Sequence, residues 1–514
     1  MKNKGECYLF GVDIGTSSSK GAIINNSGKV LAEAMVEHDI NIIKPGWVEQ
    51  DPEKCYWGDF KEITKTLLKR TQISPEDIVG IGVSSLAPDI IPIDKDGNVI
   101  RPAIIYMDRR ASAECEELER ELGSEGVVQK TGNIADPYYA GYKLEWYMRN
   151  EPENYKRTYK VLNADKFVTF RLTGRAIIDH TTAMIFAPYY DPRKGEWSHE
   201  ISELVGGGIE KLPDLYLPHE VVGHVTSEAA KATGLKAGTP VIAAGPDAIV
   251  SAYSVGMVNE GESCFMYGTT GCWFTIIDKP IYDKRLIATR HVVPGKYIIG
   301  GGMIATGGLV KWFRDNFGHV ERSMADMLNV SAYQLLDQEA EKVPPGSDGL
   351  VVLPYFLGER TPIWDIDAKG LIFGLSLSHT RAHIFRSLME AGGYGLRHHL
   401  DIAGSLGVKI KDMLAVNGGA RSRLWRQIIS DITGVPQYYV HPVPGAPYGD
   451  AFLAGIGTGV FKRFEDLKNY VQIKEKTEPN SKNHELYSKL YQIYLNLYPK
   501  VKDEYKNISK IISS

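Results

Sequence analysis

The chain has 514 residues, of which 43% are hydrophobic and 24% are charged, and its formal net charge is −4. This length exceeds what one hydrophobic core supports, so we expect at least two domains. The slight negative charge argues against nucleic acid or an anionic membrane surface as the main partner. We find no signal peptide and no apolar run near the roughly 18 residues of a membrane helix, so we expect a cytoplasmic protein that is not in a membrane.

The first third of the chain alternates strand-like and helix-like segments. We expect strands at residues 8–12, 21–24, 30–35, 79–84, 90–93 and 104–106, and helices at residues 52–70, 111–122 and 143–150. Asp96-Gly97 is typical of a tight turn between two extended segments. This alternation favours an α/β architecture over a sandwich or a helical bundle.

The first two expected strands are joined by Val12-Asp13-Ile14-Gly15-Thr16-Ser17-Ser18-Ser19-Lys20. Its Gly, Thr and Ser residues predict a turn whose N–H groups and hydroxyls surround an anion, with Thr16 and Ser17 as candidate phosphate contacts. Asp13 adds a carboxylate suited to Mg²⁺, held directly or through water, or else it closes the turn itself. Lys20 either reaches the phosphates or the substrate, or is a solvated lysine at a strand edge.

Aromatic, acidic and basic side chains follow the strands expected near residues 90 and 104. Tyr106 and Arg109 lie in a charged run, Tyr106-Met107-Asp108-Arg109-Arg110. A surface loop has this composition, but so does a site that binds a polyhydroxy ligand by stacking and paired hydrogen bonds. Asp89 and Tyr138 lie in similar positions, so we predict that these residues contact a substrate.

A break at Gly245-Pro246-Asp247 separates the two halves of the chain. A strand runs into the Gly-Pro pair, and a small-residue helix is expected at residues 248–255. We therefore predict an N-terminal domain over residues 1–245 and a C-terminal domain over residues 246–514. Asp247 either caps this helix or, at the mouth of a cleft, accepts the proton of an alcohol that attacks the γ-phosphoryl group of ATP.

Beyond the break the first pattern starts again. A hairpin is expected at residues 264–277, and its turn, Met266-Tyr267-Gly268-Thr269-Thr270-Gly271, makes Thr269 and Thr270 candidate phosphate contacts. Further expected elements are a strand at 297–299, a glycine turn at 300–302, a helix at 307–317, a strand at 413–417, a helix at 422–433 and a peripheral helix at 483–512. Three glycines of this region either allow a tight turn or contact the adenosine end of a nucleotide: Gly307, Gly418 and Gly419.

Two such turns, far apart in sequence and the first preceded by an acid, indicate a duplicated unit that holds one polyphosphate from both sides. We therefore predict an enzyme that uses ATP and Mg²⁺.

The chain also resembles the FGGY family of carbohydrate kinases from about residue 8 to 460. The motifs that carry the resemblance are GWVEQDP at 46–52, YYAGYKLEW at 138–146, GLIFGL at 370–375 with His383-Ile384 and SLME at 387–390, and NGGARS at 417–422. Ala140 departs from the Pro, Ser or Thr usual in the second motif.

This resemblance implies two RNase H-like domains of the actin-like ATPase fold with a cleft between them. By the same resemblance Asp247 matches the general base, Asp13 the acid associated with Mg²⁺, and Thr16 and Thr269 the phosphate hairpins. Nucleotide-binding positions fall on Gly307, Gly418, Gly419 and Arg423, and positions that line the sugar fall on Tyr106 and Tyr138. Relatives often form homodimers, although no residue here marks an interface.

The resemblance also bears on the small-molecule substrate. Ala87 and Pro88 occupy positions where glycerol kinases have Arg-Glu and bacterial xylulose kinases have Met-His. In contrast, GERTP at 358–362 resembles a segment of xylulose kinases and related ketose kinases. We predict a kinase of a ketose such as xylulose or ribulose, with a polyol, glycerol or a sugar acid as the alternative. An actin- or Hsp70-type conformational ATPase is the alternative of another class, which Asp247 and the polar-aromatic set disfavour.

Overall fold

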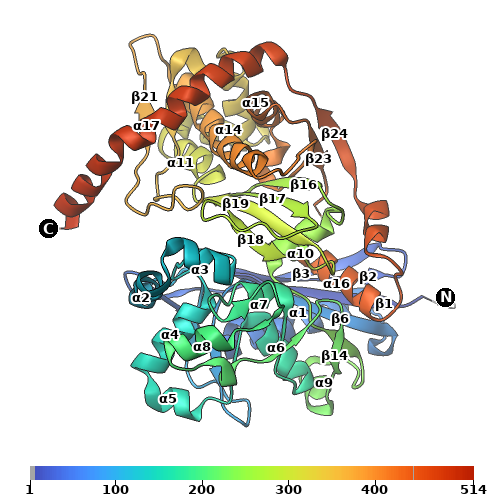
Figure 1. Ribbon diagram of the computed structural model, residues 1–514. Coiled ribbons are helices and arrows are strands. Elements are labelled where there is room, and N and C mark those ends of the chain that lie inside the picture. Colours follow the sequence, from blue (N-terminus) through green and yellow to red (C-terminus); the bar gives the residue numbers. More distant parts are fainter. Residues whose placement is uncertain (1–5, 444, 514) are drawn as a thin grey trace.

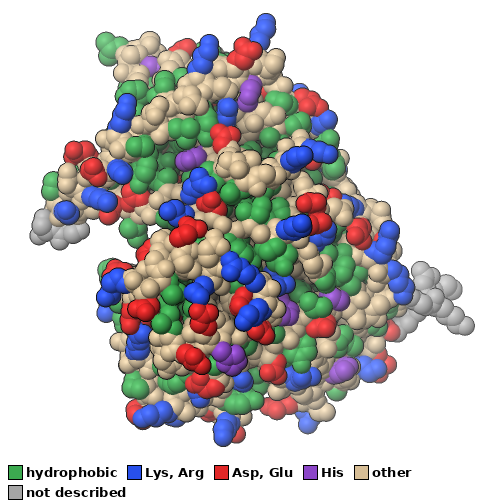
Figure 2. Space-filling view, viewed as in Figure 1, with side chains coloured by type: hydrophobic (Ala, Val, Ile, Leu, Met, Phe, Trp, Pro, Cys, Tyr) green, Lys and Arg blue, Asp and Glu red, His purple; other side chains and the backbone are tan. Residues whose placement is uncertain are grey.

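The computed structural model describes residues 6–443 and 445–513, which form two α/β halves, one above the other in Figure 1. The α/β architecture predicted from the sequence is confirmed. On the face seen in Figure 2 the surface is indented between the halves, and Lys and Arg are interspersed with Asp and Glu. Among the described helices, none is long and apolar enough to cross a membrane.

The lower half is built on a six-stranded mixed sheet. In spatial order its strands are β14 (Val221–His224), β15 (Pro240–Ile242), β6 (Ile78–Ser85), β1 (Tyr8–Ile14), β2 (Ser18–Asn25) and β3 (Val30–Glu37). β1, β2 and β3 are antiparallel, whereas β1, β6 and β15 are parallel.

The upper half is built on a seven-stranded sheet that repeats this order with one extra edge strand. Its strands are β18 (Ile287–Arg290), β19 (Tyr297–Met303), β17 (Gly271–Ile277), β16 (Ser263–Tyr267), β22 (Met413–Val416), β23 (Gln437–Val440) and β24 (Ile473–Thr477). The antiparallel set β16–β17–β19 and the parallel set β16–β22–β23 correspond to β1–β2–β3 and β1–β6–β15. The predicted duplication of the hairpin therefore extends to the whole sheet.

Helices cover both sheets. In the lower half they are α1 (Asp59–Thr71), α2 (Ser112–Leu122), α3 (Ser124–Thr131), α4 (Ala140–Asn150), α5 (Pro152–Arg157), α6 (Ala164–Thr173), α7 (His180–Met184), α8 (His199–Val205) and α9 (Ser227–Thr233). Later in the chain they are α10 (Asp247–Ser254), α11 (Gly307–Phe317), α12 (His319–Leu328), α13 (Ala332–Ala340), α14 (Arg381–Ser405), α15 (Arg423–Thr433), α16 (Gly445–Gly457) and α17 (Ser481–Ser513). Small sheets pair β4 (Asn41–Lys44) with β5 (Trp47–Gln50) and β8 (Ala103–Ile104), β7 (Ile91–Ile93) with β9 (Lys160–Leu162), β10 (Ile177–Asp179) with β13 (Asp214–Tyr216), β11 (Tyr190–Asp191) with β12 (Glu196–Trp197), and β20 (Val351–Leu353) with β21 (Leu371–Phe373).

Helix α16 is late in the sequence but packs against the sheet of the lower half. A Cβ atom on Gly11 would lie 1.8 Å from the carbonyl oxygen of Pro447, and one on Gly82 would lie 2.5 Å from that of Asp450. Glycine at both strand positions therefore lets the helix backbone approach the sheet. Together α10 and α16 build a buried apolar cluster between the two sheets, in which Val250 and Phe452 take part.

Most of the expected strands and helices are present, with two corrections. The expected turn at 300–302 is wrong, because these glycines lie inside β19, where a Cβ on Gly301 would overlap the ring of His399. The helix expected from residue 52 begins as a single π-helical segment, Glu53–Gly58, before α1. In both places tertiary packing, rather than local glycine content or helical periodicity, decides the backbone.

Replacing Gly11 with Ala should lower the free energy of unfolding by about 3 kcal/mol, because the methyl group would meet the backbone of α16. Gly404→Ala in α14 is the matched control, since nothing lies within 4 Å of its Cβ position. That variant should be unchanged or slightly more stable. Urea unfolding of both proteins measures the difference, and equal stability would contradict the close contact of α16 with β1.

Candidate active site

The first predicted phosphate turn joins β1 to β2. Asp13, near the end of β1, is paired in register with Lys20 of β2. The Oδ1 atom of Asp13 is buried and has no hydrogen-bond partner among the described residues. Thr16 donates a hydrogen bond of 3.4 Å to the hydroxyl of Tyr106, whereas Ser17 is exposed. The turn is thus linked to the predicted sugar-binding residues.

The second turn, between β16 and β17, leaves Thr269 and Thr270 exposed. Its carbonyl groups are bound by the first residues of α11: the N–H of Gly307 donates to Gly268 at 2.9 Å, and that of Gly308 donates to Thr269 at 2.9 Å. Glycine is required at 307, because a Cβ there would lie 2.3 Å from the carbonyl oxygen of Gly268. The structure therefore places Gly307 behind the turn, where it supports the backbone.

The segment after β22 lies beside the second turn. A Cβ on Gly268 would lie 3.9 Å from the side-chain nitrogen of Asn417, and Gly418 has open space around its Cβ position. Gly419 packs closely on Tyr267. The side chain of Arg423 is largely exposed, and its Nε lies 3.2 Å from Glu475. Of the predicted nucleotide residues, Gly418 has the most open surroundings.

Asp247 is the first residue of α10, where the positive end of the helix dipole favours a carboxylate. Its Oδ1 accepts a hydrogen bond of 2.6 Å from the N–H of Ala248, and Oδ2 has no partner within the described residues. Burial, with Asp165 adding to it, raises the pKa of Asp247 to about 6, while Lys20 opposes the rise. The pKa of Asp13 is raised by burial and then by Asp247, so the two carboxyl groups are electrostatic neighbours.

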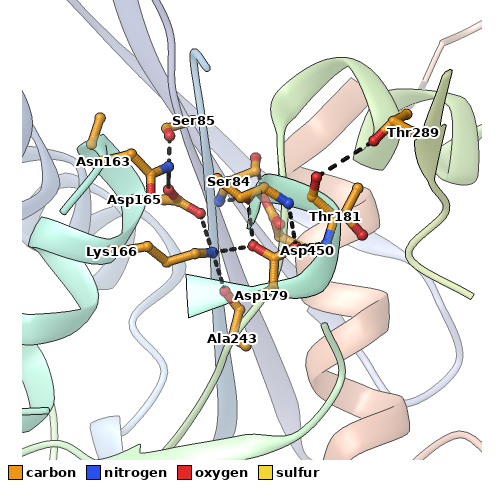
Figure 3. A network of polar contacts seen from close by, with 12 residues as sticks. Ser84, Ser85, Asn163, Asp165, Lys166, Asp179, Thr181, Ala243, Thr289 and Asp450 are labelled. Atoms are coloured by element: carbon orange, nitrogen blue, oxygen red, sulfur yellow. Dashed lines mark hydrogen bonds and ion pairs between the residues drawn. The ribbon is translucent and has the colours of Figure 1, made fainter. Parts of the chain in front are cut away.

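A buried ion-pair network surrounds Lys166 (Figure 3), and its Asp165 acts electrostatically on Asp247. The Lys166 ammonium has no solvent exposure and donates to Asp165 at 2.5 Å, to the Ala243 carbonyl at 2.5 Å and to Asp179 at 2.8 Å. Asp179 in turn caps α7. Because Ala243 is four residues before Asp247, this network fixes the backbone that leads to Asp247. Sequence reasoning missed all of these residues.

Asp450 of α16 is a further acid that the sequence did not indicate, apart from its isolation in an apolar helix. It accepts hydrogen bonds from the N–H and the hydroxyl of Ser84, at 3.2 and 2.6 Å. Burial raises its pKa well above the usual range, and Asp13 adds to the rise. The site therefore gathers carboxyl groups from both ends of the chain.

The predicted sugar contacts lie on the lower half. The rings of Tyr106 and Tyr138 meet edge to face at 6.1 Å, and the Tyr138 hydroxyl donates to the Ala87 carbonyl at 3.2 Å. Asp89 is fully buried, and its Oδ2 has no partner among the described residues. Arg109 forms a bidentate pair with Asp136, at 2.6 and 3.0 Å. The Oδ2 atom of Asp89 is therefore available, among the described residues, to accept a hydrogen bond.

Lys143, in the second resemblance motif, lies next to the loop of Tyr138. It is fully buried and donates hydrogen bonds of 2.6 Å to the carbonyls of Pro137 and Tyr138. Burial lowers its pKa to about 7. Lys143 thus holds the loop that carries Tyr138.

Arg360, in the GERTP segment, brings a cation from the upper half to the neighbourhood of Tyr106 and Tyr138. Its charge acts on Tyr138 and Tyr106, which belong to the lower half. The Nε atom is buried without a partner among the described residues, and the neighbouring Glu359 accepts from backbone N–H groups instead. In the sequence, Arg360 was visible only as part of the GERTP resemblance, which did not indicate where its guanidinium lies.

The chain is similar to known proteins over nearly its whole length. Models of the N-terminal and C-terminal domains of the FGGY family of carbohydrate kinases match residues 8–254 and 264–458. A xylulose kinase of Lactococcus lactis subsp. lactis is 31% identical, over 98% of this chain and 97% of its own. A gluconokinase of Bacillus subtilis is 28% identical, over 98% of both chains. The crystal structure of a xylulose kinase from Rhodospirillum rubrum has a TM-score of 0.88 and 32% identity, and the match covers 97% of this chain and all of that one.

Replacing Lys166 with Met should lower the free energy of unfolding by about 3–5 kcal/mol, because two buried carboxylates would lose their cation. Lys156→Met is the matched control, since its pair with Glu153 is largely exposed. That change should cost no more than about 0.5 kcal/mol. Chemical denaturation of both variants tests this, and equal losses would contradict the role of Lys166 as the central cation.

Proposed function

Since the chain belongs to the FGGY family of carbohydrate kinases, and is thus an ATP-dependent sugar kinase, we propose that its acceptor is a ketose such as xylulose or ribulose. The observation that carries the proposal is the full-length similarity to xylulose kinases, above 30% in sequence and matched in structure. The shared GERTP segment supports it, because Arg360 of that segment faces the pocket of Tyr106 and Tyr138.

We assign the phosphates of ATP to the two turns. Thr16, Ser17, Thr269 and Thr270 offer hydroxyls there, and Gly418, Gly419 and Arg423 border the second turn. We then place the adenosine end of ATP on the upper half. We place the sugar in contact with four residues of the lower half: Asp89, Tyr106, Arg109 and Tyr138. We divide the domains near residue 245, because β15 ends at Ile242 and α10 begins at Asp247.

The donor set at the first turn fits Mg²⁺. The buried and unpartnered Oδ1 of Asp13 is a hard oxygen ligand, which Mg²⁺ prefers. When bound there, Mg²⁺ would neutralise charge on the transferring phosphoryl group.

The transfer itself is an in-line displacement. The hydroxyl oxygen of the sugar forms a bond to the γ-phosphorus as the bond from that phosphorus to the bridging β,γ oxygen breaks, and ADP leaves. Asp247 accepts the hydroxyl proton. A pKa of about 6 makes it a stronger base than an ordinary aspartate and leaves it ionised at neutral pH. Lys166 and the α10 N-terminus hold it in place.

A sugar acid is the second candidate acceptor. The gluconokinase relative covers the whole chain, and the guanidinium of Arg360 has no carboxylate partner among the described residues. A carboxylate on the acceptor would pair with such a group.

The acceptor is tested by measuring ADP formed from MgATP with a panel of ketoses, aldoses, polyols, glycerol and aldonic acids. We expect kcat/KM to be at least tenfold higher for one ketopentose than for any other compound. A clear preference for an aldonate would replace the ketose with the sugar acid, and ADP formation indifferent to every compound would contradict the sugar kinase assignment.

The role of Asp247 predicts a pH dependence. Because only the ionised carboxylate accepts a proton, kcat/KM should fall as pH decreases through about 6 and level off above about 7. Asp247→Asn should lower kcat by a factor of about 10² or more. The variant should melt no lower than the parent, because Asn removes a buried carboxylate whose raised pKa costs stability at neutral pH. Near-normal turnover in the folded variant would remove Asp247 from this role.

A further inference from the structure

In the first phosphate turn, five successive carbonyl groups accept hydrogen bonds, four from other parts of the protein and one from within the turn. The donors and acceptors are Leu86 N–H to Ile14 at 2.7 Å, His38 Nε2 to Gly15 at 3.1 Å, Gln50 Nε2 to Thr16 at 2.8 Å, His38 N–H to Ser17 at 3.0 Å, and Gly15 N–H to Ser18 at 3.1 Å. All five of these carbonyl oxygens are therefore already hydrogen-bonded within the protein.

This arrangement decides where the N–H groups point. In a planar trans peptide the C=O of one residue and the N–H of the next point in opposite directions. With the carbonyls of Gly15 and Thr16 bound by His38 and Gln50, the N–H groups of Thr16 and Ser17 point the other way. Neither N–H has an acceptor within the described residues, so both are available to an anion.

His38 is the member of this set of donors that also contacts a carboxylate. Its Nε2 faces the Gly15 carbonyl, which can only accept, so Nε2 carries a proton. Its Nδ1 lies 2.6 Å from Oδ2 of Asp59, which also accepts 2.8 Å from the Ser19 hydroxyl. The side chains of His38 and Asp59 are 3% and 8% exposed. A ring with acceptors at both nitrogens satisfies both only when it carries both protons.

In the second turn the carbonyls are held by backbone N–H groups rather than by side chains. Its Gly268 and Thr269 carbonyls are bound by backbone N–H groups of Thr306, Gly307 and Gly308 at the start of α11. Among the described residues, no helix start donates hydrogen bonds to the carbonyls of the first turn. His38 and Gln50, held by Asp59 and by the Tyr56 hydroxyl at 2.9 Å, take that place.

We propose that His38 is a positioning residue for phosphate binding: as an imidazolium paired with Asp59, it holds the Gly15 carbonyl away from the nucleotide and the Thr16 N–H toward it. The inference rests on the proposed function in one respect, namely that ATP phosphates bind the first turn. Without this donor the Gly15 carbonyl is free to turn toward the phosphates and repel them.

The test is His38→Gln, which keeps a donor but cannot carry charge or bond Gly15 and Asp59 together. We expect the KM for ATP and the Kd for MgADP, measured by calorimetry, to rise about tenfold, the scale of one charge-assisted hydrogen bond. The KM for the sugar should stay within about twofold. His180→Gln is the matched control, because His180 bonds only the Tyr190 hydroxyl, at 2.9 Å, among the described residues. It should leave both nucleotide constants unchanged.

Asp59→Asn provides a second variant in case His38→Gln does not fold. It keeps the imidazole but removes its anion, and should raise the Kd for MgADP about threefold. NMR of protein labelled with ¹⁵N-histidine should also show one ring with both nitrogens protonated at neutral pH, which is absent from His38→Gln. Parental nucleotide affinity in folded His38→Gln, or a singly protonated His38, would overturn the inference. Since MgADP titration needs no acceptor, a failure of the kinase assignment would be seen separately, as a parent protein without sugar-dependent ADP formation.

Discussion

Buried negative charge is the constraint on which the rest of this structure depends. Five aspartates lie close enough to influence one another, and burial raises the pKa of each: Asp13, Asp89, Asp165, Asp247 and Asp450. Such a cluster is unfavourable unless cations, hydrogen bonds and helix termini offset it. Lys166, Ser84 and the start of α10 provide these. The same burial makes Asp247 a stronger base and leaves oxygens of Asp13 and Asp89 unpartnered.

The duplication of the fold gives each half a hairpin turn of the same kind. Each half presents an antiparallel hairpin beside two parallel strands, and α10 and α16 pack between the sheets. In both turns the carbonyls accept hydrogen bonds from the protein, which directs the N–H groups of the same peptides the opposite way. The means differ: a helix start supports the second turn, and buried side chains support the first. The two halves thus share a backbone arrangement, but different local contacts support the turn in each half.

The proposed sugar site also draws on residues of both halves. Tyr106 and Tyr138 come from loops of the lower half, which Lys143 and the pair of Arg109 with Asp136 hold in place. Arg360 comes from the upper half and brings a charge to the same tyrosines. Because the pocket is shared in this way, movement of one half relative to the other would change the surroundings of the sugar and of Asp247 together.

The sequence by itself determined the local features of this protein. Glycine and small hydroxyl residues between alternating apolar segments predict both phosphate turns, because turn chemistry acts over a few residues. Asp247 was predicted for the same reason, because the strand-to-helix break that it follows is visible in the local sequence. The family motifs indicated the fold. Asp450, Lys166 and Arg360 were missed, as was the course of residues 300–302. Asp450 meets Ser84 across 366 residues of sequence, and Lys166 meets Ala243 across 77. Such contacts leave no short-range pattern, so only the tertiary structure decided which charges balance one another and how the carboxylate of Asp247 is held.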